Sequence, residues 1–384
     1  MIAKLTKKLA QRQTLLLTLA AVAFIRMVLL AGLPYESALG YGDIQTYFQL
    51  AQIPGLPYLN SWSEYPPLFP FITELVFVLS NANQYAFSYI LIILFLAADL
   101  ANIALFSSLA GSTPAGQRQT ALFAVFICAL PYTWWYFDSL VVFFVLLSIY
   151  LVRKDRPLSA AVSIGLGALF KLFPLILLGW LARKLPRDRF LRILAVAGLM
   201  VALVYGLLWA LSPEFTLASL QSQPSKGSWQ TVWAILDGNF NTGSFGPIAD
   251  RLQPGKAELP INNPARISPL VTLPFFLALG FWRTFRTKIT LKNEMAFIGL
   301  AWTLFFIWMP GWSPQWVYYL LPMLILALPL RTAALFGATL IFANLLEWPL
   351  LLSRGLFWTL PITILLRTLL LAILAIEFDS RLKK

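Results

Sequence analysis

Long apolar runs alternate with short polar or basic gaps along almost the whole chain. A helix rises about 1.5 Å per residue, so roughly 20 apolar residues cross a hydrocarbon core of about 30 Å. The pattern therefore predicts an all-α, polytopic membrane protein with about twelve transmembrane helices, several of them too short to cross without help. The runs lie near 14–32, 66–80, 85–107, 119–133, 137–152, 158–182, 190–211, 268–282, 294–310, 317–330, 332–350 and 356–378.

The composition supports the same class of protein. Of the 384 residues, 59% are hydrophobic and only 12% are charged, whereas soluble domains carry about 25% charged residues. Most of the surface must therefore face lipid. No polar stretch is long enough for a soluble catalytic domain, so residues 1–384 are expected to form a single membrane-embedded domain.

The excess of basic residues predicts the topology. The chain has 29 Lys and Arg against 16 Asp and Glu, a net charge of +13, and many of the cations lie in gaps between runs. Basic gaps mark cytoplasmic loops, which argues against nucleic acid as the partner and predicts cytoplasmic N- and C-termini. The segments 34–66 and 212–266 would then lie outside. The cations in question are Lys4, Lys7, Lys8, Arg12, Arg183, Lys184, Arg187, Arg189, Arg192, Arg283, Arg286, Lys288, Lys292, Arg381, Lys383 and Lys384.

One basic turn conflicts with a simple count of crossings. Residues 153–156 would fall outside if every apolar run crossed once. Two arrangements return this turn to the cytoplasmic side. Either the run at 66–80 is re-entrant, or the run at 158–182 folds back on itself at Lys171.

Two absences restrict the chemistry. The chain has no histidine and a single cysteine, Cys128, which excludes Ser-His-Asp and Cys-His catalysis, histidine-built zinc sites, internal disulfides and iron-sulfur clusters. An enzyme of this composition would use Asp or Glu as its proton acceptor. We expect no metal and no cofactor.

The first outside segment, 34–66, places two carboxylates among aromatic residues. Asp43 lies four residues before Tyr47, and Glu64 immediately precedes Tyr65. Apolar neighbours raise a carboxyl pKa into the range useful for a general base. The competing interpretation is that Asp43 only caps a short helix. Pro66-Pro67 predicts that a further helix begins just after Glu64.

Lys171 lies inside an apolar run, where a charged residue is costly and marks a binding or transport site by default. It would hold an anionic group such as a phosphate, or else its side chain would snorkel to the membrane surface. Acidic residues also occur in or beside apolar runs: Glu74, Asp99, Asp138 and Glu347. We expect the aromatic cluster before Asp138 to be an interfacial belt rather than a sugar platform. Arg26 and Arg367 would either pair with such acids or line the cavity.

The second outside segment, 212–266, mixes tryptophan, amides and cations, a combination common at carbohydrate sites. The alternative is a solvated loop. A turn rich in Trp and Pro follows at 308–316. The candidate phosphate-binding cations in the segment are Lys226, Arg251 and Arg266, and the candidate sugar- or acceptor-binding residues are Tyr47, Tyr65, Trp229, Gln230, Asp237, Asn239, Gln315 and Trp316.

These elements together resemble the glycosyltransferase-C superfamily of membrane enzymes, particularly its bacterial and archaeal mannosyltransferase-like branch. The resemblance extends from about residue 40 to about 320, and it depends on the order of the elements rather than on any one of them. The elements are Gly42-Asp43 with Tyr47-Phe48, Glu64-Tyr65-Pro66-Pro67-Leu68, Lys171-Leu172-Phe173-Pro174, Ser228-Trp229-Gln230-Thr231, Asp237-Gly238-Asn239 and Ser313-Pro314-Gln315-Trp316.

The resemblance implies an inverting transferase that moves a hexose, mannose in this branch, from a polyprenyl-phosphate donor to a glycolipid or glycan acceptor on the extracytoplasmic side of the plasma membrane. Asp43 would be the catalytic base and Glu64 a second carboxylate. Lys171, with Lys226, Arg251 or Arg266, would stabilise the departing phosphate. The chain has no Asp-x-Asp motif and no phosphate-binding glycine loop, so a nucleotide-sugar donor has no evident site. A flippase or transporter of lipid-linked sugars is the alternative function.

Overall fold

The computed structural model describes residues 2–383, with side chains except at 2–11, 281, 284 and 285. The side chains of Lys4, Lys7 and Lys8 therefore lie outside the described residues. Residues 2–383 form helices and no strand. The longer helices are α1 (Ile2–Gly32), α4 (Leu68–Leu79), α5 (Gln84–Ala110), α6 (Pro114–Ala129), α8 (Asp138–Arg153), α9 (Pro157–Phe170), α11 (Arg187–Leu211), α12 (Pro213–Ser225), α14 (Pro269–Arg286), α15 (Glu294–Trp308), α16 (Val317–Ala327), α17 (Leu330–Leu345) and α18 (Leu360–Leu382).

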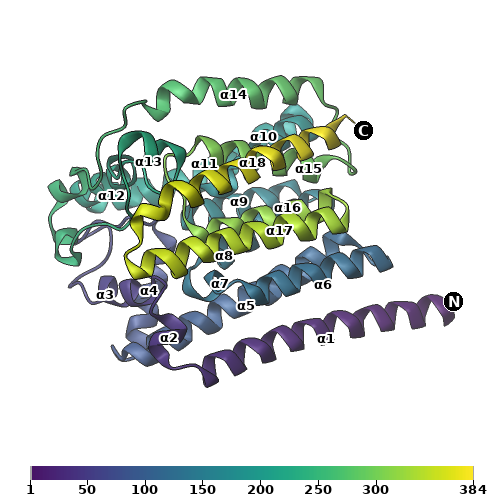
Figure 1. Ribbon diagram of the computed structural model, residues 1–384, viewed down its shortest axis with the longest axis horizontal. Coiled ribbons are helices and arrows are strands. Elements are labelled where there is room, and N and C mark those ends of the chain that lie inside the picture. The colour runs from purple at the N-terminus through teal and green to yellow at the C-terminus, as the bar shows by residue number, and fades with distance from the viewer. Residues whose placement is uncertain (1, 384) are drawn as a thin grey trace.

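The helices lie roughly along one axis and form a bundle with two distinct ends (Figure 1). Both chain termini lie at one end, which we call the basic end, and the segments 34–66 and 212–266 lie at the opposite end, which we call the loop end. Ion pairs join the basic turns: Arg189 contacts Asp155 at 2.7 Å, and Arg153 and Lys184 both contact Glu294. The clustering of basic gaps at one end is therefore confirmed.

The run at 158–182 folds back at Lys171, as the second of the two predicted arrangements requires. Helix α9 ends at Phe170, and Lys171 is extended with φ −165°. The chain then returns through the short helices η1 (Phe173–Ile176) and α10 (Leu177–Lys184) to the basic end. Gly167 permits the reversal, because a Cβ there would lie 2.9 Å from Pro174 Cγ. With 14 residues, α9 is about 21 Å long, shorter than a hydrocarbon core of about 30 Å, so the chain reverses at Lys171 before a full crossing.

The twelve apolar runs therefore do not correspond to twelve single crossings. Helix α4 follows Pro67, as the proline pair predicts, and its 12 residues extend only about 18 Å at the loop end. Among the described residues, five helices are long and apolar enough to cross a membrane, and shorter apolar helices accompany them. The five are Arg12–Gly32, Gln84–Ala110, Arg187–Leu211, Leu330–Arg354 and Phe357–Leu382.

Buried polar residues connect the helices inside the bundle. Arg26 of α1 lies 3.8 Å from Asp99 of α5, and the Tyr318 hydroxyl of α16 donates to the same carboxylate at 2.9 Å. Arg367 of α18 pairs with Glu347 at 2.7 Å. A charge at membrane depth is tolerated when it faces the bundle interior and is paired. The expectation that Arg26 and Arg367 neutralise buried acids is confirmed.

Candidate functional site

The two long segments of the loop end bind each other directly. The Trp62 amide donates to the Arg251 carbonyl oxygen, and the Trp62 indole donates to the Asp250 carbonyl oxygen, both at 2.9 Å. The Gln223 amide donates to the Glu64 carbonyl oxygen at 2.8 Å. The prediction left open whether 212–266 is a solvated loop. Its packing against 34–66 shows that it is an ordered part of one site.

Glu64 and Arg251 form the centre of this contact. One edge of the guanidinium binds the carboxylate in a bidentate manner, with Nη2 to Oε1 at 3.0 Å and Nε to Oε2 at 3.2 Å. Arg251 also donates to two carbonyl oxygens of its own loop and stacks over Trp62. Each side chain is buried. All three guanidinium nitrogens and both carboxylate oxygens have a hydrogen-bond partner. The pair therefore braces the two segments, and its hydrogen-bonding groups are not free to act as a second base or to hold a phosphate.

Asp43 is positioned by a close approach of the backbone to the aromatic turn at 132–136. Its amide donates to the Trp135 carbonyl oxygen at 3.3 Å. The preceding Gly42 leaves no room for a side chain, because a Cβ there would lie 2.3 Å from Trp135 Cβ. Helix α3 (Ile44–Ala51) begins after Asp43, as predicted, but the Asp43 side chain makes no capping hydrogen bond. The helix-cap interpretation is therefore wrong for the carboxylate, which remains available for chemistry.

The surroundings of the Asp43 carboxylate favour a base that titrates near neutrality. Burial raises its pKa to about 6, and the nearby Glu64 charge acts in the same direction, whereas Lys226 and a hydrogen bond from Tyr65 oppose the shift. The Tyr65 hydroxyl lies 3.4 Å from Oδ2. A carboxylate with this pKa is mostly ionised at pH 7 yet basic enough to accept a proton.

Lys226, at the end of α12, carries the second uncommitted group of the site. Its side chain is 8% exposed, and its ammonium lies over the rings of Trp229 and Phe245 at 4.3 and 4.5 Å. Among the described residues, no hydrogen bond or ion pair engages this ammonium. Burial lowers the Lys226 pKa to about 8, and the charges of Glu64 and Asp43 oppose that shift. Lys226 is thus a buried cation with free donors close to Asp43.

Lys171 reaches the same region from the fold-back. Its ammonium lies 2.8 Å from Asp138 Oδ1, which also accepts a hydrogen bond from Tyr319. Asp138 Oδ2 is buried without a hydrogen-bond partner among the described residues. The Lys171 ammonium therefore does not snorkel to a surface, and Asp138 is its counterion. The aromatic residues 134–137 before Asp138 are buried inside the bundle, so the expected interfacial belt is wrong. The Lys171 side chain is 18% exposed, so the ammonium keeps donors for a ligand.

Aromatic rings fill the space between these charged groups. The Tyr47 ring packs edge-to-face against Tyr65 and Phe69, and Tyr65 packs against Phe137. The Lys171 ammonium lies 5.2 Å from the centre of the Trp316 ring. The polar atoms of three predicted binding residues are buried without described partners: Tyr47 Oη, Gln315 Oε1 and Trp316 Nε1. Buried polar groups of this kind call for a ligand or water.

The Trp229 ring is packed inside the protein and is not available to stack on a sugar. A Cβ on Gly243 or Gly311 would lie 2.6 or 2.2 Å from the indole, so the ring is pressed between two glycine backbones. Its side chain is 5% exposed. The neighbouring Gln230 has φ +52° and donates to Glu347 at 2.7 Å. Both side chains are buried, so neither presents an open face to a sugar.

Three further predicted residues brace the long segment and do not join the cluster around Asp43. Asp237 accepts hydrogen bonds from the Ser228 hydroxyl at 2.6 Å and from the Arg266 backbone amide at 2.8 Å. Asn239 donates to the same Ser228 hydroxyl at 2.9 Å. The Arg266 side chain is exposed. Of the four predicted phosphate-binding cations, only Lys171 and Lys226 lie in the site with free donors.

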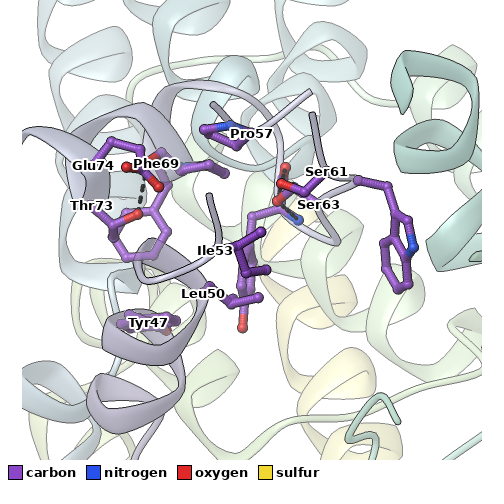
Figure 2. A pocket seen from close by; sticks show the side chains of 12 residues that line it. Tyr47, Leu50, Ile53, Pro57, Ser61, Ser63, Phe69, Thr73 and Glu74 are labelled. Atoms are coloured by element: carbon purple, nitrogen blue, oxygen red, sulfur yellow. Dashed lines mark hydrogen bonds between the residues drawn. The ribbon is translucent and has the colours of Figure 1, made fainter. Parts of the chain in front are cut away.

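A narrow cleft runs beside the Asp43 region between α3, the following connection and α4 (Figure 2). Thr73 and Glu74 lie on one side of it and Ser61 and Ser63 on the other. Tyr65, the hydrogen-bond partner of Asp43, is also part of its wall. The cleft therefore brings polar groups and apolar side chains together next to the candidate base.

The described residues contain no group of three or more His, Cys, Asp or Glu arranged to hold a metal ion. In the cluster around Asp43, the charged groups available for chemistry are Asp43 and Lys226, which have no ion pair with a described residue, and the partly exposed Lys171; Glu74 lines the neighbouring cleft. Comparisons of the chain with protein-family models, with curated proteins and with solved structures find no match.

Proposed function

We propose that this protein is an inverting glycosyltransferase that moves a hexose, mannose in the first instance, from a polyprenyl-phosphate donor to a lipid or glycan acceptor. The observation that carries the proposal is that Asp43 and Lys226 lie in one site and that neither forms an ion pair with a described residue. Asp43 is a carboxylate with a pKa of about 6 and no capping role, and Lys226 is a buried ammonium without a described partner. A carboxylate of this kind can activate the acceptor hydroxyl, and a cation of this kind can stabilise the departing phosphate.

In the proposed reaction the Asp43 carboxylate accepts the proton of the acceptor hydroxyl while that oxygen attacks the anomeric carbon. The bond from the anomeric carbon to the phosphate oxygen breaks, and its electron pair leaves with the polyprenyl phosphate. The Lys226 ammonium, together with Lys171, stabilises the negative charge that develops on that oxygen. Attack opposite the leaving group inverts the configuration. Tyr65 holds the Asp43 carboxylate in place.

The location of the site supports a lipid-borne donor. The Asp43 region lies at the loop end, away from the basic turns that the positive-inside rule assigns to the cytoplasm, so we place the chemistry on the extracytoplasmic side. The short helix α4 and the break at Lys171 lie beside the site and leave polar groups at membrane depth. A donor whose phosphate is attached to a membrane lipid can reach such groups sideways through the bilayer.

The test is sugar transfer by the purified protein in nanodiscs. Radiolabelled mannose on a synthetic polyprenyl phosphate is supplied with total membrane lipid as acceptor, in EDTA. The expected result is label in a new glycolipid or glycan with inverted anomeric configuration. Absence of transfer from mannosyl, glucosyl, galactosyl and arabinosyl donors, combined with movement of the donor lipid across the bilayer, would contradict the proposal and favour the flippase.

A further inference from the structure

A second cavity lies at the basic end, opposite the Asp43 region. It has a volume of ≈ 370 Å³ and is formed where the ends of α5, α8 and α16 meet the connection before α15. Its polar lining consists of Arg153, Gln119 and Lys292. No residue of the proposed transferase site takes part in it.

The cavity offers hydrogen-bond donors, and the carbonyl and carboxylate oxygens that Arg153 and Gln119 contact are already engaged. Arg153 Nη1 donates to the Leu109 carbonyl oxygen, and Gln119 donates to the Ile325 carbonyl oxygen, both at 2.8 Å. Arg153 Nε donates to Glu294 at 2.7 Å, which leaves Nη2 without a described partner. The Lys292 ammonium has no hydrogen bond or ion pair to a described residue. A ligand that supplies acceptors is therefore favoured.

The local charge is positive as well. Glu294 is a buried acid beside the cavity, and its two oxygens are bound by Arg153 and Lys184. Two cations against one carboxylate leave one positive charge, and Lys292 adds another. Helix α15 begins at Glu294 and Met295 lines the cavity, so the positive end of the helix dipole also points to this region. The excess charge around Glu294, the charge of Lys292 and the helix dipole would each favour the binding of an anion.

Apolar side chains complete the wall and distinguish a lipid from a free anion. Leu109, Leu291, Met295 and Leu326 line the cavity beside the polar groups. Leu291 is 68% exposed and immediately precedes Lys292. An apolar residue next to a cation at the end of a membrane bundle suits a ligand that has both a phosphate and an acyl chain. We propose that this cavity binds the phosphate headgroup of an anionic phospholipid of the surrounding leaflet.

The test measures phospholipid binding by the full-length protein in a neutral detergent, independently of sugar transfer. Phosphatidylglycerol, phosphatidylcholine and inorganic phosphate are titrated separately, with bound lipid counted by native mass spectrometry and thermal stability followed in parallel. The expected result is that phosphatidylglycerol binds and raises the melting temperature more than phosphatidylcholine does. Lys292→Ala is expected to weaken that binding about fivefold, the effect of one cation near a membrane surface.

The matched control is Lys288→Ala, which removes the same charge from the same connection at an exposed position outside the cavity lining. It should leave phosphatidylglycerol binding within error of the unaltered protein. Arg153→Lys keeps a cation for Glu294 but removes the free guanidinium donor, and it should also weaken binding. Equal losses for Lys292→Ala and Lys288→Ala, or equal binding of the two phospholipids, would overturn the proposal. So would inorganic phosphate that competes as well as the lipid does.

Discussion

The pKa values of Asp43 and Lys226 predict that the specificity constant kcat/KM for sugar transfer is highest near pH 7. Asp43 acts as a base only when ionised, so the rate should fall as the pH drops below its pKa of about 6. Lys226 stabilises the leaving phosphate only when protonated, so the rate should fall as the pH rises above about 8. The two titrations together give a bell-shaped profile.

The size of the effect follows from the same two values. At pH 7 each group is about nine-tenths in its active form, so about 80% of the protein is competent. At pH 5 only about one-tenth of the Asp43 carboxyls remain ionised, and at pH 9 only about one-tenth of the Lys226 amines remain protonated. Transfer should therefore fall about eight- to tenfold at either pH relative to pH 7.

The assay is initial-rate transfer at subsaturating donor between pH 5 and pH 9, in mixed buffers at constant ionic strength. Lys226→Arg keeps the charge and removes the titration, because an arginine stays protonated throughout this range. This variant should lose the alkaline limb and retain the acidic one. An alkaline limb that persists unchanged in Lys226→Arg would refute the assignment of that limb to Lys226. A flat acidic limb would refute the shifted pKa of Asp43.

Two further predictions concern the packing that holds the site together. Gly42→Ala should lower the transfer rate about 10²-fold, because the added Cβ would lie 2.3 Å from Trp135 and displace the adjacent base Asp43. The control is Gly32→Ala, whose Cβ would have no atom within 4 Å. Equal transfer rates in the two variants would contradict the argument. Glu64→Gln should reduce the free energy of unfolding by about 3–5 kcal/mol, since it leaves the buried Arg251 charge unpaired. The melting temperature measures this loss, and the double variant Glu64→Gln/Arg251→Gln should recover part of it; additive losses would show that the pair is not coupled.

Much of the bundle could be predicted because hydropathy encodes it locally. The run at 85–107 appears as Gln84–Ala110 and the run at 190–211 as Arg187–Leu211. The fold-back at 158–182 could only be left as one of two possibilities, since its cause is a tertiary contact. Gly167 allows Pro174 to pack closely against the backbone, and hydropathy does not predict such a tertiary contact.

The roles of individual charges depended on partners far away in the chain. Glu64 is separated from Arg251 by 187 residues, so no local signal distinguished this braced carboxylate from the free one at Asp43. Lys226 and Arg251 are both cations of the same segment, yet packing leaves one ammonium uncommitted and engages the other side chain fully. The role of Asp138 could have been inferred from the sequence, because a lysine inside an apolar run requires an acid nearby.

The Asp43 carboxylate is the centre of the account, and replacing it tests the account most directly. Transfer from polyprenyl-phosphate mannose is compared in Asp43→Asn and in Glu36→Gln, which alters an exposed carboxylate of the same segment. The account predicts that Asp43→Asn lowers the transfer rate about 10²- to 10⁴-fold, the contribution of a general base, while Glu36→Gln leaves it unchanged. Transfer by Asp43→Asn at the rate of the unaltered protein would contradict it.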